Sequence, residues 1–255
     1  MFGSSRQVAI EFLPDDEGQG WVADSLQDLV PRLGPAAQKP QLLTQSKPPR
    51  SSDDLFEFMC DVQAQVGQSD VEFGLVDAAE AGPEVPPGFT PLGNPAGQLM
   101  TTFARGPEFV TVVAPILFRK TELVFAAVAR ELGRIAVARA GGHHMEPADF
   151  ESEAELAAIA LGMGVWVANG SYIFQNACCG GGCGINLKNL RVGLSMPEAC
   201  FATALDGHRK GVSRRSIAKH LDSNQKAAFK QSWGHVAGAP ALKALASGNA
   251  GALAG

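Results

Sequence analysis

The stretch from residue 123 to residue 138 constrains the fold most strongly, because it is apolar except for one charged pentapeptide. The apolar runs 123–129 and 135–138 flank Arg130-Glu131-Leu132-Gly133-Arg134. An apolar run of this length favours a buried helix, in which charged side chains are costly unless they pair internally or line a cleft. The alternative is a solvated helix face with short-range ion pairs. We favour a buried helix that carries a polar site or an ion network.

The pentapeptide has the spacing of the zinc-protease motif H-E-x-x-H, with arginine in place of both histidines. In that motif, two histidines about one helical turn apart bind Zn²⁺ and the glutamate acts as general base. Arg130 and Arg134 are degenerate metal positions, since a guanidinium has no lone pair to give a metal. Glu131 remains as a vestigial general base, and we expect the neighbouring guanidiniums to keep it firmly ionised.

The order of segments resembles that of small bacterial zincin-type metallopeptidase homologues. Residues 128–134 stand where these proteins read V-A-H-E-L-G-H, and residues 151–169 take the place of their T-D-L-x-A-x-x-L-G-x-G-x-x-x-A-N segment. The resemblance implies an α+β, zincin-like fold, with a small N-terminal mixed sheet and a C-terminal helical bundle. It also implies that Glu155 occupies the acidic position that supplies or supports the third metal ligand. An edge strand, here Phe109 to Val113, would flank the site.

The missing histidines argue against hydrolysis, because a zincin needs its metal to polarise the carbonyl and to lower the pKa of the bound water. We therefore expect a catalytically inactive metallopeptidase-like protein, without zinc or another cofactor. Glu155 would join an Arg-Glu-Arg network, and a protein or peptide partner would add to the strand edge, or the chain would serve as an accessory subunit. The alternative is a metal-dependent hydrolase with displaced ligands, drawn from His143, His144 and Glu151 beside Glu131 or Glu155.

A glycine-rich segment holds three of the five cysteines, Cys178, Cys179 and Cys183. Five cysteines cannot all pair, which disfavours a disulfide scaffold. A thiol-based redox or metal-binding protein built on this loop is a further alternative function. The spacing lacks the paired C-x-x-C of a zinc knuckle, so we favour small cysteines in a glycine loop.

Composition and charge disfavour several classes of partner. The 255 residues are 45% hydrophobic and 18% charged, which is enough for a substantial core. Residues 1–100 carry 15 acidic and 5 basic side chains, whereas the remainder carries 11 and 16. The acidic half disfavours nucleic-acid binding.

No run has the length of a membrane span or the pattern of a signal peptide, so we expect a cytoplasmic protein without a membrane partner.

Turn residues and periodicity predict three segments: residues 1–52 as an N-terminal strand and proline-rich loop, 53–236 as the zincin-like α+β domain, and 237–255 as a low-complexity tail. The predicted strands are 8–13, 71–76, 98–105 and 109–114, the last two forming a hairpin that turns at Gly106-Pro107. The predicted helices are 55–66, 118–140, 150–177, 196–209 and 213–234.

Overall fold

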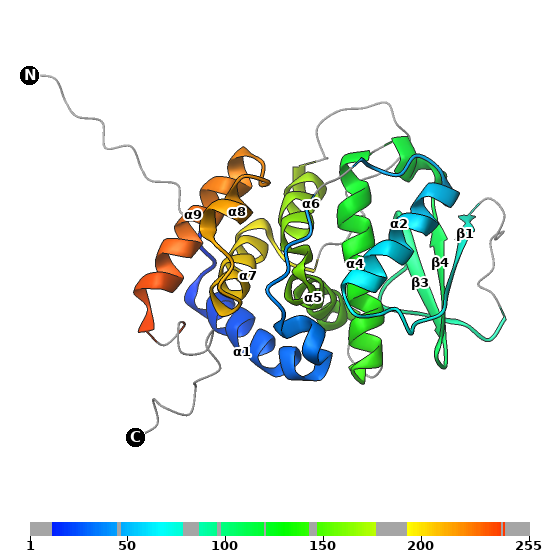
Figure 1. Cartoon of the computed structure of the whole chain (residues 1–255), viewed down its shortest axis with the longest axis horizontal. Coiled ribbons are helices and arrows are strands. Elements are labelled where there is room, and N and C mark those ends of the chain that lie inside the picture. The colour runs from blue at the N-terminus through cyan, green and yellow to red at the C-terminus, as the bar shows by residue number, and fades with distance from the viewer. Residues whose placement is uncertain are drawn as a thin grey trace, which may run out of the picture.

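The fold is α+β, with a small sheet at one end of a predominantly helical body (Figure 1). The computed structural model describes residues 12–44, 47–78, 87–95, 98–119, 121–142, 147–176, 193–240 and 242. Its strands are β1 (Phe73–Asp77), β2 (Thr90–Pro91), β3 (Met100–Arg105) and β4 (Glu108–Val113). Its α-helices are α1 (Asp16–Leu33), α2 (Ser52–Gln65), α4 (Thr121–Arg139), α5 (Pro147–Ala158), α6 (Gly164–Asn176), α7 (Met196–Arg209), α8 (Arg214–Ala218) and α9 (Ser223–Gly238).

The sheet is mixed and has the strand order β1-β4-β3-β2. β1 runs parallel to β4, and the other two pairings are antiparallel. The predicted hairpin is confirmed: β3 and β4 pair from Met100↔Val113 to Arg105↔Glu108, and the turn between them uses Gly106 at φ 60°. The prediction that Phe109 to Val113 forms an edge strand is wrong, because β1 and β3 pair with β4 on its two sides.

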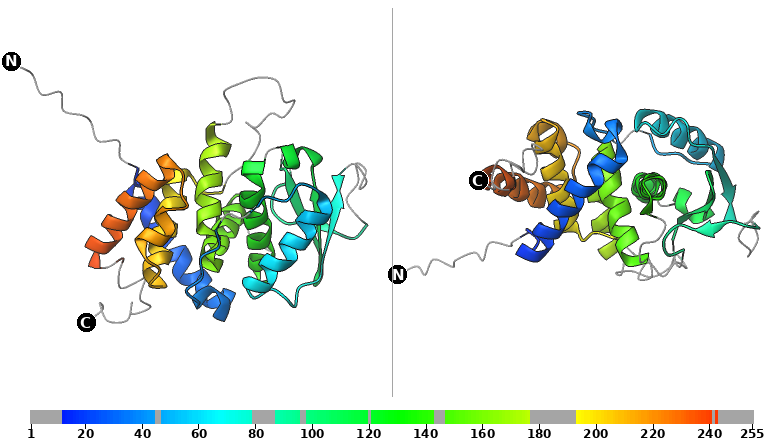
Figure 2. Two further views of the ribbon diagram at one scale, coloured as in Figure 1. Left: turned by 45° about the horizontal axis from the view of Figure 1, so that its top comes forward. Right: turned by 90° about the horizontal axis from the view of Figure 1, so that it is seen from below.

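Helix α4 is the central element of the fold. It contacts β3 on one side and both α5 and α6 on the other, and Figure 2 shows it end-on between the sheet and these helices. Beyond them, α7 contacts α6, α1 and α9. All α4 residues from Leu123 to Ala138 are buried, including Gly133, which has no side chain. The predicted buried helix around the charged pentapeptide is therefore confirmed.

Helix α1 was not predicted from the sequence. Its N-terminus is capped by Asp15, whose side chain accepts a hydrogen bond from the backbone N–H of Gly18. Val22, Leu26 and Leu29 recur on one face and are buried. This apolar face packs on α5 and α7, and its burial outweighs the poor helix propensity of the glycines and of Pro31 within the segment. Most of the predicted strand at 8–13 lies outside the described residues.

The predicted continuous helix at 150–177 is instead two helices, α5 and α6, joined by a π-helical turn at Ile159–Met163. Gly162 lies there at φ 93°, a conformation that favours glycine. The backbone groups released by the turn find other partners. The Gly162 carbonyl accepts from the N–H of Leu43 at 2.8 Å, and the Ala160 carbonyl accepts from Nζ of Lys210 at 2.5 Å.

The C-terminal helices follow their sequence signals in part. The predicted capping box of α7 is present, with Ser195 and Glu198 exchanging side-chain and backbone hydrogen bonds. The predicted helix at 213–234 is divided into α8 and α9. Most of the predicted tail, 243–255, lies outside the described residues. Among the described residues, no helix is both long enough and apolar enough to cross a membrane.

Candidate functional site

The charged residues of α4 lie against two carboxylates of α5. Arg130, Glu131 and Arg134 are 4%, 1% and 0% exposed, and Glu151 and Glu155 are 3% and 2% exposed. Both the two arginines and the two α5 glutamates are four residues apart, so each pair lies on one face of its helix. Arg130 pairs with Glu155 and Arg134 pairs with Glu151, as expected for two helices that run antiparallel. We call these five residues the ion network.

Arg130 binds Glu155 through two nitrogens. Its Nε lies 3.0 Å and its Nη2 2.6 Å from Oε1 of Glu155. Its Nη1 donates to Oε1 of Gln98 at 3.2 Å. The second oxygen of Glu155 accepts from the backbone N–H of Leu194 at 2.8 Å. The predicted partnership between an arginine of the pentapeptide and Glu155 is therefore present, and it links α4 to α5 and to the start of α7.

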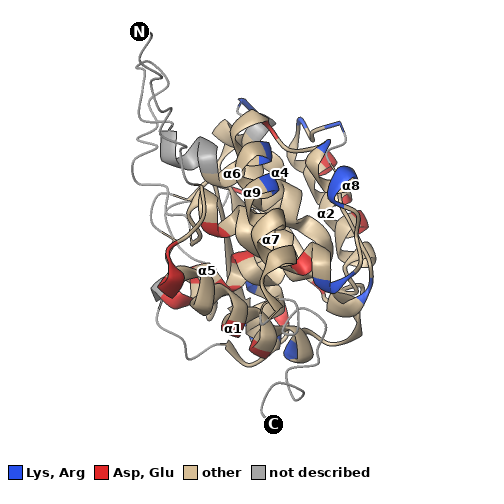
Figure 3. Cartoon of the chain, turned by 90° about the vertical axis from the view of Figure 1, so that its left-hand side faces the viewer, with Lys and Arg blue, Asp and Glu red and all other residues tan. Residues whose placement is uncertain are grey.

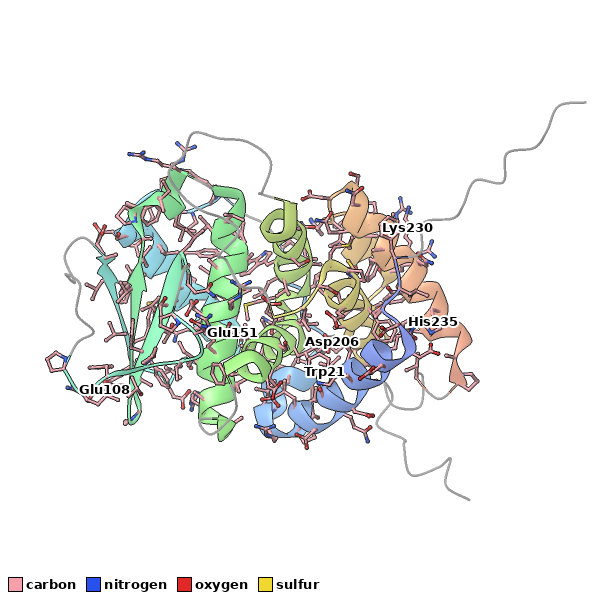
Figure 4. All side chains as sticks on the ribbon, turned by 180° about the vertical axis from the view of Figure 1, so that it is seen from behind. Trp21, Glu108, Glu151, Asp206, Lys230 and His235 are labelled. Carbon is pink, nitrogen blue, oxygen red and sulfur yellow. The ribbon has the colours of Figure 1, made fainter. Side chains whose placement is uncertain are left out.

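Arg134 bridges the other two carboxylates. Its Nη1 donates to Oε1 of Glu131 at 2.7 Å, and its Nη2 lies 2.8 and 2.7 Å from the two oxygens of Glu151. Oε2 of Glu131 accepts from the backbone N–H of Thr102 in β3 at 2.9 Å. Glu151 also accepts from the N–H of Asn94 at 3.0 Å. Figure 4 shows Glu151 in the interior beside α4, where the network joins the sheet to the helical body.

Burial dominates the electrostatics of the network. The pKa of the Glu131 carboxyl is raised by its burial, against the lowering effects of Arg134 and of the Thr102 N–H and with a further rise from Glu151. This direction is contrary to the expectation that its guanidinium neighbours keep Glu131 firmly ionised. For Arg134, burial lowers the pKa, but attraction to Glu131 and Glu151 outweighs it and raises the pKa overall, so the guanidinium stays charged. Two cations face three carboxyl groups, and one carboxyl proton would balance the charge.

Two glycines make room for the network. A Cβ on Gly133, inside the pentapeptide, would overlap the carbonyl oxygen of Ala154, so this glycine permits the close approach of α4 and α5. A Cβ on Gly93 would overlap Oε1 of Glu151, and Gly93 lies at φ 71°. Gly133 is needed for packing, and Gly93 is needed for packing as well as for its backbone conformation.

The structure brings together only some of the residues that the sequence singled out. Glu151, predicted as a ligand of a displaced metal site, is instead held by Arg134. His143 and His144, and the thiol candidates Cys178, Cys179 and Cys183, lie outside the described residues. Within the part of the chain that is described, no group of three or more His, Cys, Asp or Glu side chains could hold a metal ion.

Several partners of the network were missed by sequence reasoning. The N–H groups of Thr102, Asn94 and Leu194 are backbone donors, which no side-chain pattern announces. Gln98, which accepts from Arg130, lies just before β3 and could have been inferred only from a correct strand arrangement.

A pocket of about 280 Å³ lies at the C-terminal end of α4, away from the network. Arg32, Asp70 and Arg139 are among its lining residues, and none of the five network residues lines it. Asp70 and Arg139 form an ion pair at 2.5 Å that is partly exposed to solvent. This pocket therefore does not connect the network residues to solvent.

Comparison with known proteins adds no family assignment. No family model matches the chain, and neither the curated proteins nor the solved structures give a match.

Proposed function

We propose that this is a catalytically inactive metallopeptidase-like protein, which acts by binding a protein or peptide or as an accessory subunit. One observation carries the proposal. The two arginines that stand at the histidine positions of the zincin-like motif are both buried and both bound to carboxylates. A guanidinium at each position offers no lone pair and repels a divalent cation.

The vestigial general base is also engaged. A general base needs a carboxylate oxygen within reach of a water or substrate proton. One oxygen of Glu131 accepts from Arg134 and the other accepts from the Thr102 N–H. At 1% exposure, the side chain does not meet bulk water. Glu131 therefore serves the fold as an acceptor that connects α4 with β3.

The network takes a structural role that a bound metal fills in a zincin. It ties α4 to α5, to β3 and to the residues before α7 through charge-assisted hydrogen bonds. Buried ion pairs add little net stability, but loss of one partner costs about 3–5 kcal/mol because a charge is left without compensation. The arrangement thus favours one packing of the helices over others.

Zinc stoichiometry and peptidase activity test the proposal. The native protein should contain no stoichiometric zinc and should cleave no peptide. The double variant Arg130→His, Arg134→His restores both histidines of the motif beside Glu155. We expect it to bind one zinc ion, because His, His and Glu form a common zinc ligand set. Arg139→His on the same helix is the matched control, since this exposed position has no part in the network.

Two results would contradict the proposal. Stoichiometric zinc in the native protein, lost on substitution of Glu131 or Glu155, would show a working metal site. A folded double variant that binds no more zinc than the Arg139→His control would remove the support that the zincin-like frame gives. Circular dichroism of both variants establishes that they are folded.

A further inference from the structure

We propose that the outer edge of β1, together with the acidic face of α2 beside it, binds a basic peptide as an added β-strand. The inference rests on the proposed function, because it names the chemistry of the peptide partner. It concerns a different surface from the ion network, since β4 separates β1 from the strand that contacts Glu131.

The backbone of β1 is paired on one side only. The carbonyl of Glu72 accepts from the N–H of Phe109, so the alternating residues Gly74 and Val76 also direct their backbone groups toward β4. Phe73 and Leu75 therefore direct theirs to the other side. Within the described residues, no backbone hydrogen bond satisfies them there. An edge with unpaired N–H and C=O groups can accept a further strand.

The two edges of the sheet differ in a way that selects β1. All five residues of β1 remain partly exposed. The opposite edge, β2, is two residues long and one of them is Pro91, which has no N–H to donate. β1 offers the longer edge, and its outward residues Phe73 and Leu75 can both donate and accept.

An exposed aromatic side chain lies beside this edge. Phe56 on α2 is 40% exposed, and it is one of two large hydrophobic residues described as exposed. Its ring centroid lies 5.2 Å from that of Phe73 in β1. The figures show α2 next to β1, in agreement with the contacts between them (Figures 1 and 2). An apolar side chain of an added strand would find these rings as its nearest contact.

The surroundings of the edge are acidic. Residues 51–78 contain seven acidic residues and no lysine or arginine: Asp53, Asp54, Glu57, Asp61, Asp70, Glu72 and Asp77. The side chains of Asp53, Glu57, Asp61 and Glu72 are exposed and form no ion pair within the described residues. Charge complementarity therefore selects a partner rich in lysine or arginine.

A second copy of this chain is the competing occupant. Four of its basic residues, Arg214, Arg215, Lys226 and Lys230, lie on α8 and α9, and Figure 3 shows α8 as a basic helix. These residues lie on helices, and a helix cannot present the extended backbone that pairs with a strand edge. A separate peptide in an extended conformation fits both the charge and the unpaired backbone.

The test measures fluorescence anisotropy with a labelled heptapeptide of alternating lysine and valine. We expect it to bind, and to bind more weakly as the ionic strength is raised. The same peptide with glutamate for lysine should bind at least about tenfold more weakly. N-methylation of alternate peptide amides should cause a similar loss, since it removes the donors that a strand needs. Equal binding of all three peptides would overturn the proposal.

Two protein variants locate the site. Leu75→Pro removes an outward-facing N–H and leaves the ladder to β4 intact, so we expect at least about tenfold weaker binding by the folded variant. On addition of the lysine peptide, the amides of Phe73 and Leu75 should gain protection from hydrogen exchange. Unchanged affinity in a folded Leu75→Pro variant, or protection elsewhere only, would contradict binding at this edge.

Charge substitutions separate a local effect from one of net charge. Neutralising Asp53, Glu57 and Asp61 together should weaken binding roughly tenfold, as expected for three exposed ion pairs.

The matched control neutralises Asp16, Glu17 and Asp24, three exposed acids of α1. Equal losses in the two triple variants would refute a local site. Sedimentation of the native protein without peptide should show a monomer. A dimer that Leu75→Pro abolishes would instead assign the edge to a second copy.

The outcome is independent of the metal experiment. Stoichiometric zinc in the native protein would refute catalytic inactivity and leave the anisotropy result standing. Failure of the lysine peptide to bind would refute the docking site and leave the metal result standing.

Discussion

Replacement of Arg134 by methionine should be severely destabilising at neutral pH. The side chain is fully buried and donates to both Glu131 and Glu151. Methionine resembles the aliphatic stem of arginine and carries no charge, so both carboxylates lose their cation. Breaking a buried pair costs about 3–5 kcal/mol. This approaches the whole stability of many domains, which is about 5–15 kcal/mol.

Protonation limits the part of that loss that a stranded charge causes. The stranded Glu131 carboxyl can take up a proton instead of remaining charged. For an ordinary pKa near 4.5, protonation at pH 7 costs about 3.4 kcal/mol, at about 1.36 kcal/mol per pH unit. This cost limits the part of the loss that a stranded charge on Glu131 causes, and we expect a total loss of about 3–5 kcal/mol. The loss should shrink toward pH 4.5, because protonation then costs little.

Urea unfolding followed by circular dichroism, at neutral and at acid pH, measures both effects. Arg139→Met is the matched control: this arginine lies on the same helix, is 40% exposed and pairs with Asp70. Its loss should be below about 1 kcal/mol, as for other exposed pairs. Adding Glu131→Gln and Glu151→Gln to Arg134→Met should recover most of the stability.

A folded Arg134→Met variant that loses no more stability than Arg139→Met at neutral pH would refute this reasoning. A large loss that stays constant between neutral and acid pH would also refute it, because the stranded carboxylates would then not be its cause.

Three further predictions concern single positions. Burial raises the pKa of Glu131 in the folded state above its ordinary 4.5. The stabilisation that the Glu131 carboxyl contributes is therefore full below pH 4.5 and is lost as the pH rises from 4.5 through the raised pKa. Over that pH range, the urea midpoint of the Glu131→Gln variant should rise relative to that of the native protein. Gly133→Ala should lower the stability by about 1–3 kcal/mol, because the added Cβ forces α4 away from α5. Gly20→Ala on α1 has open space at its Cβ and should raise the stability by up to about 1 kcal/mol. Thermal melts should show a lower midpoint for the first variant and a higher one for the second. Burial raises the pKa of the Cys200 thiol to about 12, so mass spectrometry should find this cysteine unmodified by iodoacetamide until the protein is unfolded.

Local signals in the sequence were sufficient for several elements. The β3–β4 hairpin follows from the turn signal Gly106-Pro107 between two predicted strands, and the start of α7 follows from the capping box at Ser195. The burial of the pentapeptide follows from the apolar residues on its two sides. In each case the deciding interactions are between residues close in sequence.

Other features depend on partners far away in the chain. Helix α1 contains weak helix formers, and only contact with α5 and α7 accounts for it. The interior position of β4 follows from its pairing with β1, about 35 residues earlier in the sequence. The break between α5 and α6 depends on Leu43 and Lys210, which donate hydrogen bonds to the backbone carbonyls of Gly162 and Ala160. No local pattern contains this information.

The candidate site was predictable in its charges and not in its pairing. Glu155 was expected to join the arginines, and it does. Glu151 pairs with Arg134 instead of lying among metal ligands, because sequence spacing does not show which of two carboxylates on one helix face meets which cation. The pKa of Glu131 shifts in the direction opposite to the expected one because burial outweighs neighbouring charges, and the degree of burial is a property of the whole fold.

The crosswise pairing of Arg130 with Glu155 and of Arg134 with Glu151 has a consequence for how the chain can change over generations. Loss of either arginine leaves a carboxylate without its cation in the interior, so a viable route to a different set of residues requires matched changes on α4 and α5. Each arginine should thus covary with its own glutamate when homologous chains diverge. Substitutions at an arginine and at its paired glutamate should therefore occur together. The four paired positions should accept substitutions more slowly than the apolar residues around them.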